Sequence, residues 1–366
     1  MNVLERVILY TNPIPHLRSR NGYFPGVAAL PNGELLALFT RGEAFESADS
    51  TTVVSRSRDQ GRTWEFEGPL SAAKPGRADS DYMKTTMLPD GRILAMGYRF
   101  HRDDPDQPLV NVATNGIRSG EIITAFSSDL GHTWTRPEPV PVPFRELIEV
   151  SGPALALQNG DLLAGGGLFM PWEGGLTDGQ QKGVLLRSRD GGRTWKPDSD
   201  YFDTPGHRVT PFESRFVEMQ PGRLVGLVWA FDQQAGVSQG NRIVVSHDHG
   251  RTWSEPQDIG VNAQSSNLLW LGGEQLLTIH AHRSPPEGLY VRLIDFTGDK
   301  WNVIEEACIW NGQGAGEYKG LSGMAAALRF GQPSLVALPD HGYLAVHWSI
   351  EEGQGLIRTH RFCFGI

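Results

Sequence analysis

Carboxyl side chains are the residues of this sequence whose types could perform chemistry together. Glu213 stands in the stretch ESRFVEMQPGRL, whereas Glu46 and Asp49 stand with Glu43 in the stretch RGEAFESADS. Two carboxyl groups placed across a glycosidic bond can hydrolyse it, one as general acid and the other as nucleophile or base. We therefore expect Glu213 to pair with Glu46 or Asp49, if the fold brings the two stretches together.

Four other acids could replace one member of that pair. They are Asp81, Glu149, Asp232 and Glu317. Each of the loop acids could instead be a solvated carboxylate with no chemical role. Glu213 differs, because the position expected for it below is poorly solvated, and a glutamate there needs a reason.

A short repeat indicates which elements must position these acids. The pattern S-x-D-x-G-x-T-W occurs four times, as SRDQGRTW from Ser57, SSDLGHTW from Ser127, SRDGGRTW from Ser188 and SHDHGRTW from Ser246. The intervals suit a four-stranded unit with variable loops. We interpret the boxes as structural: the aspartate accepts backbone N–H bonds, the glycine permits positive φ, and the tryptophan packs between sheets. Four aspartates in four units would lie too far apart to bind calcium or catalyse together.

A second repeat predicts six β-hairpins, each made of two apolar runs around a Pro, Asn, Asp or Gly turn. The six are GVAALPNGELLALF from Gly26, TTMLPDGRILAM from Thr85, PALALQNGDLLAG from Pro153, FVEMQPGRLVGLV from Phe216, NLLWLGGEQLLTI from Asn267 and SLVALPDHGYLAV from Ser334. In four of them a third strand such as TTVVSRS and then the box follow the hairpin.

The two repeats predict an all-β fold, a six-bladed β-propeller of four-stranded antiparallel blades in a single domain covering residues 1–366. The fifth box is eroded to IDFTGDKW, and the sixth blade ends at GLIRTHRFCF without a fourth strand. We expect RVILYT, at Arg6 to Thr11, to supply that strand and close the ring, which leaves only short sheet edges.

The boxes resemble the Asp-box, or bacterial neuraminidase repeat, and six such blades resemble the sialidase superfamily over nearly the whole chain. A fold of this kind does not settle function. The resemblance implies that sugars bind on the face opposite the boxes. Counting back from each hairpin glycine places six residues around the centre of that face: Phe24, Tyr82, Ser151, Glu213, Gln264 and Gln332.

Sialidases carry an arginine triad for the substrate carboxylate, a Tyr/Glu nucleophile pair and an aspartate acid/base, and the sequence departs from this set. Phe24 stands where the resemblance places the first arginine, Trp229 where it places the second, and Gln332 where it places the nucleophilic tyrosine. Glu213 matches the family glutamate. Tyr82 could be a displaced nucleophile or acid, or an aromatic lining residue. Without its arginine clamp the site is a poor one for sialic acid.

Several other residues are candidates for substrate binding on the same face. Trp172, Trp229 and Trp348 could stack on a sugar ring, and Arg99, Arg215 or Arg283 could hold an acidic group differently. His280 and His282, in IHAHR, share one strand face and could be polar residues at the pocket rim, structural histidines, or metal ligands if a third donor joined them. Our prediction is no metal and no cofactor.

Composition limits the partners. The chain has 366 residues, a net charge of -9 and no basic tract, which argues against nucleic acid as a partner. No run of apolar residues is long enough to cross a membrane, and the N-terminus does not resemble a signal peptide. Two cysteines are too few for a disulfide framework. We expect a cytoplasmic protein with a carbohydrate ligand, in an oligomeric state that the sequence leaves open.

These observations favour a glycoside hydrolase that acts on a non-sialic sugar through a carboxylate pair. The alternative is a sugar-binding or scaffolding propeller without catalysis. A true exo-sialidase and a polysaccharide lyase are lesser alternatives.

Overall fold

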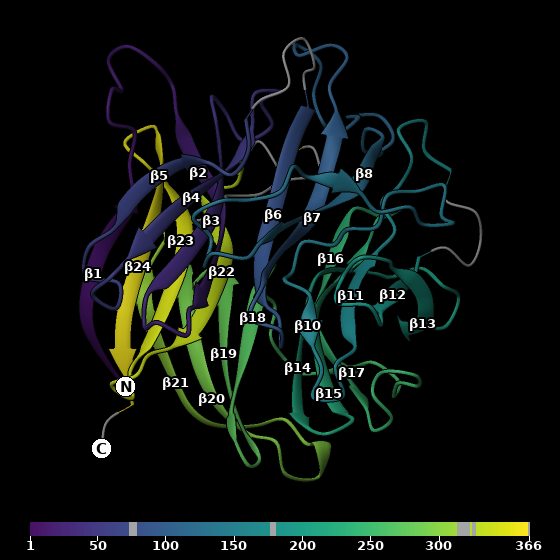
Figure 1. Ribbon diagram of the computed structural model, residues 1–366. Coiled ribbons are helices and arrows are strands. Elements are labelled where there is room, and N and C mark those ends of the chain that lie inside the picture. The colour runs from purple at the N-terminus through teal and green to yellow at the C-terminus, as the bar shows by residue number, and fades with distance from the viewer. Residues whose placement is uncertain (73–78, 176–180, 313–322, 324–326, 365–366) are drawn as a thin grey trace.

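Six four-stranded antiparallel sheets build the chain in the computed structural model (Figure 1). The structure describes residues 1–72, 79–175, 181–312, 323 and 327–364. Each sheet contains strands in sequence order, so each is a blade formed by a consecutive stretch of chain, with one exception at the closure of the ring. The prediction of a nearly all-β, six-bladed propeller is confirmed.

The strands of the first three blades are β2 (Asn21–Ala29), β3 (Leu35–Gly42), β4 (Thr51–Ser57) and β5 (Glu65–Pro69); β6 (Asp79–Met87), β7 (Ile93–His101), β8 (Gly120–Ser127) and β9 (Glu138–Pro139); and β10 (Leu155–Ala156), β11 (Leu162–Gly167), β12 (Gly183–Ser188) and β13 (Lys196–Phe202). Strand β4 coincides with the predicted strand TTVVSRS.

The strands of the last three blades are β14 (Thr210–Gln220), β15 (Arg223–Asp232), β16 (Val237–Ser246) and β17 (Gln257–Asp258); β18 (Ser266–Gly272), β19 (Gln275–His282), β20 (Gly288–Asp295) and β21 (Asn302–Asn311); and β22 (Phe330–Ala337), β23 (Tyr343–Glu351), β24 (Gln354–Cys363) and β1 (Asn2–Tyr10). A short 3₁₀ helix, η1 (Thr297–Asp299), replaces the fifth box.

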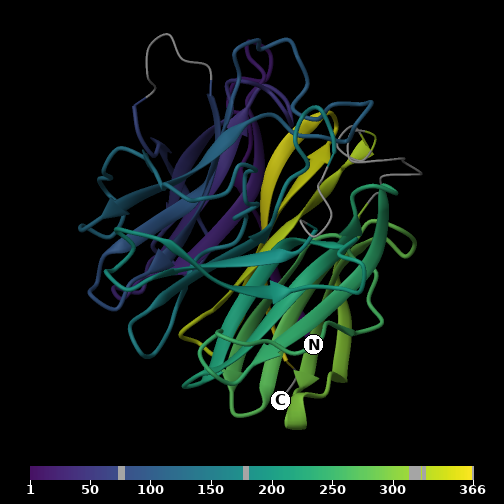
Figure 2. The same cartoon turned by 90° about the vertical axis from the view of Figure 1, so that its right-hand side faces the viewer.

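The ring closes through the N-terminus, as predicted. Strand β1 pairs antiparallel with β24, from Asn2 opposite Cys363 to Tyr10 opposite Ile357. It begins four residues before the predicted RVILYT segment. Figure 1 shows the purple first strand beside the yellow last strand, and Figure 2 shows the first and last blades side by side. The first and last segments of the chain are therefore joined in one sheet.

The core lies between the blades, because each inner strand is buried on both faces. In β3, for example, Leu35 to Phe39 are all at most 1% exposed. The sequence of such a strand is a continuous apolar run rather than an alternation of apolar and polar residues. This burial explains why the sequence shows six apolar hairpins.

The Asp boxes are turn structures, as the sequence predicted. In the second box Asp129 accepts bonds from the Thr133 backbone N (2.9 Å) and from Ser127 Oγ (2.7 Å), and Trp134 Nε1 donates to the Gly131 carbonyl (3.0 Å). Gly131 has a φ of 84°. The other three boxes repeat this pattern around Asp59, Asp190 and Asp248.

No helix within the described part of the chain is long and apolar enough to cross a membrane. Cys308 and Cys363 are both free thiols.

Candidate active site

Three blades carry a distorted residue at the same position of their first strand. Phe24 in β2, Glu213 in β14 and Gln332 in β22 have positive φ angles of 51°, 50° and 40°. Each one interrupts the regular register between the first and second strands of its blade. A β-bulge of this kind redirects a side chain, and non-glycine residues with positive φ concentrate at functional sites.

Each bulge is held by a polar group from a neighbouring blade. Lys84 Nζ on β6 donates to the Phe24 carbonyl. The Glu213 backbone N donates to Glu149 Oε2 (2.9 Å), and the Gln332 backbone N donates to Ser265 Oγ (2.8 Å). The conformations that would be strained in isolation are thus fixed by contacts between blades.

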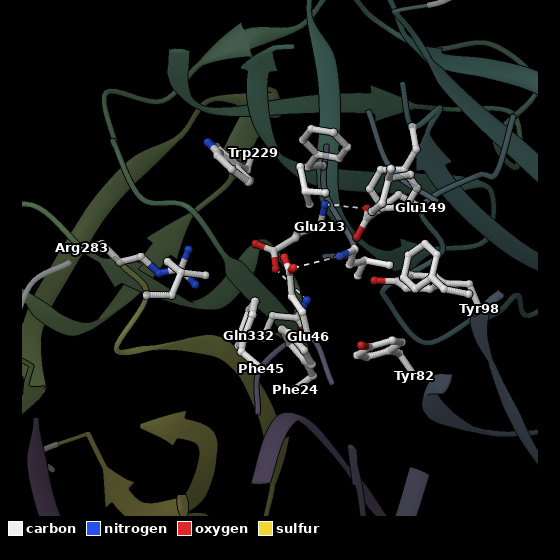
Figure 3. A pocket seen from close by; sticks show the side chains of 17 residues that line it. Phe24, Phe45, Glu46, Tyr82, Tyr98, Glu149, Glu213, Trp229, Arg283 and Gln332 are labelled. Atoms are coloured by element: carbon white, nitrogen blue, oxygen red, sulfur yellow. Dashed lines mark hydrogen bonds between the residues drawn. The ribbon is translucent and has the colours of Figure 1, made fainter. Parts of the chain in front are cut away.

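The three bulged residues line one cavity of about 150 Å³ (Figure 3). Its wall is mainly aromatic and aliphatic, with three carboxyl groups and one guanidinium among its residues. The lining comprises Phe24, Phe45, Glu46, Tyr82, Tyr98, Phe100, Leu109, Val110, Ile117, Glu149, Phe169, Phe212, Glu213, Trp229, Arg283, Leu328 and Gln332. We call this cavity the central pocket.

Glu213 is the acid of the pocket with the strongest evidence for a functional role. Its Oε1 accepts a bond from Gln332 Nε2 (2.7 Å), whereas its buried Oε2 accepts no hydrogen bond from any residue that the structure describes. Burial raises the pKa of the Glu213 carboxyl, and the positive charges of Arg283 and Arg215 oppose that rise. A buried carboxyl oxygen without a partner is costly unless a ligand completes it.

Glu149 lies behind Glu213 and is only 3% exposed. Burial and the negative charge of Glu213 raise the pKa of Glu149 to about 8. At neutral pH this side chain is therefore mostly protonated while Oε2 still accepts the Glu213 N–H. Its position makes it a support for the Glu213 bulge.

Glu46 reaches the pocket from the loop between β3 and β4. Figure 3 shows it extending from the side of Phe45 and Phe24, opposite the strand that carries Glu213. The Leu109 backbone N donates to Glu46 Oε2 (3.1 Å), and Arg102 Nη1 donates to the Glu46 carbonyl (2.6 Å). Burial raises the pKa of the Glu46 carboxyl. The arrangement places two carboxyl groups from different blades in one poorly solvated pocket.

Arg283 supplies the guanidinium of the pocket. Nη1 donates to Gln264 Oε1 (2.6 Å) and Nε donates to the Phe330 carbonyl (2.9 Å). A Cβ at Gly331 would lie 2.0 Å from Arg283 Nη2, so only glycine leaves room for this side chain. Gln264 does not line the pocket, but it positions Arg283.

Tyr82 and Trp229, both predicted site residues, belong to the aromatic wall. The Tyr82 ring packs against Tyr98 with centroids 5.6 Å apart, and burial raises the pKa of Tyr82 to about 12. Trp229 Nε1 donates to Ser238 Oγ (2.9 Å). Trp348 is fully buried, with its ring 5.4 Å from that of Phe45, and belongs to the core under the wall.

Other predicted residues lie away from the central pocket. Asp49 and Arg99 line a separate cavity with Asp81, whose carboxylate accepts bonds from Thr52. Asp49 Oδ1 accepts the Glu43 backbone N–H (3.0 Å), so it stabilises its own loop. Trp172 lines a third cavity.

His280 and His282 are internal to the fifth blade. His280 is fully buried between Ser266 Oγ (2.8 Å) and Thr278 Oγ1 (3.0 Å), and His282 Nε2 lies 3.2 Å from Arg292. No cluster of three His, Cys, Asp or Glu side chains that could hold a metal occurs among the described residues.

The remaining candidates have structural partners or lie outside the structure. Asp232 Oδ1 accepts backbone N–H bonds in the turn after β15, and Ser151 Oγ accepts a bond from Arg215. Glu317 lies outside the described residues.

Sequence reasoning missed most of the apolar wall. Tyr98 is directly opposite Tyr82 in the second hairpin, and Phe212 is opposite Trp229 in the fourth. Cross-strand register from the hairpin turns could have located Tyr98. In contrast, the third blade begins with a strand of only two residues, so counting back from its turn gave Ser151 where Glu149 lines the pocket.

Comparison with known proteins identifies one repeat family and several structures of similar fold. The BNR/Asp-box repeat family matches residues 244–255. None of the curated proteins matches this chain in sequence. A protein of unknown function from Dyadobacter fermentans superposes with a TM-score of 0.78 at 20% identity, over 100% of this chain and 99% of that one.

Two structures of carbohydrate-active proteins are also similar. The NanB sialidase from Streptococcus pneumoniae has a TM-score of 0.67 at 14% identity, over 98% of this chain and 70% of that one. The α-L-arabinanase of Penicillium chrysogenum, solved with arabinobiose, has a TM-score of 0.68 at 16% identity, over 99% of both chains.

The fold and the repeats define the class: this chain is a six-bladed β-propeller with Asp-box turns, and its fold is similar to that of the sialidase and arabinanase structures. At these low identities the structural likeness concerns the fold.

Proposed function

We propose that this protein is a glycoside hydrolase that cleaves a neutral, non-sialic sugar in the central pocket. The observation that carries the proposal is the pair Glu46 and Glu213, two partly buried carboxyl groups from different blades that line one aromatic pocket. Hydrolysis of a glycosidic bond requires such a pair.

Glu46 is the general acid in this mechanism. Burial in an apolar wall raises its pKa, and a raised pKa favours the protonated form that a general acid needs. Glu213 acts as the carboxylate, either as nucleophile or as the base that activates water. Three cations, Arg283, Arg215 and Lys84, oppose the rise in its pKa, and the Gln332 amide donates to it.

The pocket favours a neutral sugar over sialic acid. Of the described residues that line it, Arg283 alone carries a guanidinium, and two of its nitrogens are already bonded to Gln264 and Phe330. A carboxylate substrate would need further donors in that wall. Aromatic rings such as Trp229 can instead pack on the apolar face of a neutral sugar. The fold neighbours include a sialidase and an arabinanase, which supports a carbohydrate ligand without choosing it.

A non-catalytic sugar-binding protein is the second candidate. It is favoured by Tyr82, whose raised pKa makes it a poor nucleophile or base, and by the loss of the family tyrosine at Gln332. Tyr82 is accordingly assigned to the wall, and a lyase reaction is the less favoured enzyme activity.

The test is product release from sialylated, uronic, neutral and deoxy-sugar oligosaccharides by the wild type, Glu213→Gln and Glu46→Gln. The control is Asp49→Asn, because Asp49 comes from the same loop as Glu46 but does not line the pocket. Turnover of a neutral class, lost in both glutamine variants and kept in the control, supports the proposal. Release of sialic acid contradicts the substrate assignment, and ligand binding without turnover favours the second candidate.

A single domain over residues 1–366, a cytoplasmic location and the absence of nucleic-acid or membrane partners stay predictions, as does the expectation that the reaction needs no cofactor.

A further inference from the structure

A second cavity adjoins the central pocket and contains one of the predicted sugar-binding tryptophans. Its volume is about 350 Å³, compared with about 150 Å³ for the central pocket. Ile117 and Phe169 line both cavities, so the two spaces share one wall. We call the second space the Trp172 cavity.

The wall between the cavities is built by close contact of two loops. The Ile117 backbone N donates to the Met170 carbonyl (2.8 Å), and Ile117 also forms a β-bridge with Pro171. A Cβ at Gly116 would lie 1.9 Å from the Pro171 carbonyl oxygen, so the approach depends on glycine. The loop of the second blade is therefore fixed against the loop of the third.

Trp172 is held in place on this wall. Its carbonyl accepts bonds from Asn111 Nδ2 (2.9 Å) and Thr114 Oγ1 (2.7 Å). The Arg118 guanidinium lies 4.4 Å from the centre of the Trp172 ring, and Arg118 Nε donates to the Pro108 carbonyl (2.9 Å). An aromatic ring that is immobilised before binding loses little entropy when a ligand packs on it.

The polar groups of the Trp172 cavity are of both signs. Arg118 and Arg145 line it together with Asp103, Glu146 and Glu173. Donors and acceptors mixed in this way suit hydroxyl groups, whereas an acidic sugar would meet three carboxylates. The cavity is thus matched to a neutral, hydroxyl-rich ligand.

We propose that the Trp172 cavity binds the sugar residue next to the one held in the central pocket, so that the substrate is a neutral oligosaccharide of at least two residues. This inference rests on the proposed function for the identity of the first site. It assigns Trp172 to substrate recognition outside the pocket that contains Glu46 and Glu213.

The experiment measures binding rather than turnover, using the Glu213→Gln protein so that no ligand is consumed. The probes are the mono-, di- and trisaccharides of the β-1,4-gluco, β-1,4-galacto, β-1,4-xylo and α-1,5-arabino series, titrated by calorimetry. In at least one series we expect the disaccharide to bind about tenfold more tightly than the monosaccharide. Trp172→Ala should remove this gain and leave monosaccharide affinity unchanged.

Two further variants keep the test decisive. Arg145→Ala, which changes an exposed side chain of the same cavity, should reduce the gain even if Trp172→Ala fails to fold. Trp270→Ala, which removes a tryptophan of β18 that lines neither cavity, should change nothing.

Equal affinity for mono- and disaccharides, an equal loss of both in Trp172→Ala, or no binding in any series would overturn the inference. If the disaccharide binds more tightly than the monosaccharide but the wild type shows no turnover, the proposed hydrolase activity is wrong. The binding site in the Trp172 cavity is then still supported.

Discussion

Gln332 Nε2 donates a 2.7 Å hydrogen bond to Glu213 Oε1, which joins the sixth blade to the fourth at two residues that are both held in positive φ. The bond stabilises the charged form of Glu213 relative to the protonated form. Gln332 stands where the family resemblance would place a tyrosine, so in this chain an amide contacts Glu213 at that position.

Replacing Gln332 by alanine should therefore raise the pKa of Glu213 further. If Glu213 must be ionised, the acidic limb of the pH profile of kcat/KM moves to higher pH in Gln332→Ala. Gln275→Ala, an exposed glutamine of β19, serves as control. An unchanged profile would show that Gln332 does not set the ionisation of Glu213.

Glu149→Gln should stabilise the protein relative to the wild type by an amount that grows as the pH rises from about 5 to about 8. The folded pKa of Glu149, about 8, exceeds its ordinary value of 4.5, so the folded state binds the extra proton between these values. Wild-type stability contributed by this group is complete below pH 4.5 and is lost as pH rises through 8, at up to about 1.4 kcal/mol per pH unit.

The glutamine variant cannot ionise, and its amide oxygen can still accept the Glu213 N–H. The difference between its melting temperature and that of the wild type should therefore grow steadily from pH 5 to pH 8. Glu149→Leu should be about 1–3 kcal/mol less stable than Glu149→Gln at every pH, because neither side chain ionises and in the leucine variant the Glu213 N–H loses its acceptor. If the melting temperatures of wild type and Glu149→Gln change with pH in parallel across this range, the raised pKa assigned to Glu149 is wrong.

Gly331→Ala should weaken ligand binding without changing either carboxyl group. The added methyl would displace the Arg283 guanidinium, which lies 2.0 Å from the position of the new atom. We expect Gly331→Ala and Arg283→Ala to lose affinity to a similar extent, and the double variant to lose no more than either one. Additive losses, measured by calorimetry, would mean that Gly331 acts elsewhere.

Asp129→Ala tests the structural assignment of the boxes. The change removes the acceptor for the Thr133 N–H and hydroxyl and the partner of Ser127. Each net hydrogen bond contributes about 0.5–1.5 kcal/mol, so the loss of these three bonds should lower the free energy of unfolding by about 1.5–4.5 kcal/mol. Turnover per folded molecule should stay unchanged. A selective loss of activity would revive a catalytic role for the boxes.

Part of the candidate site was predictable because the hairpin turns set the register of the blades. Counting back from a turn glycine located Phe24, Glu213 and Gln332, which all line the central pocket. The same counting gave no information about Glu46 and Asp49, which are three residues apart in one loop. Glu46 lies in the pocket because Leu109 and Arg102, from the second blade, hold it there.

The sequence by itself determined the six blades, the box turns and the closing strand, since these depend on local turn chemistry and on apolar runs within short segments. Tertiary structure alone decided which loop residues meet. His280 is enclosed by its own blade, Trp348 lies beneath the pocket wall, and Trp172 faces a second cavity. The placements of Trp348 and Trp172 depend on contacts between segments that are 60 or more residues apart in the chain, and no local pattern encodes such contacts.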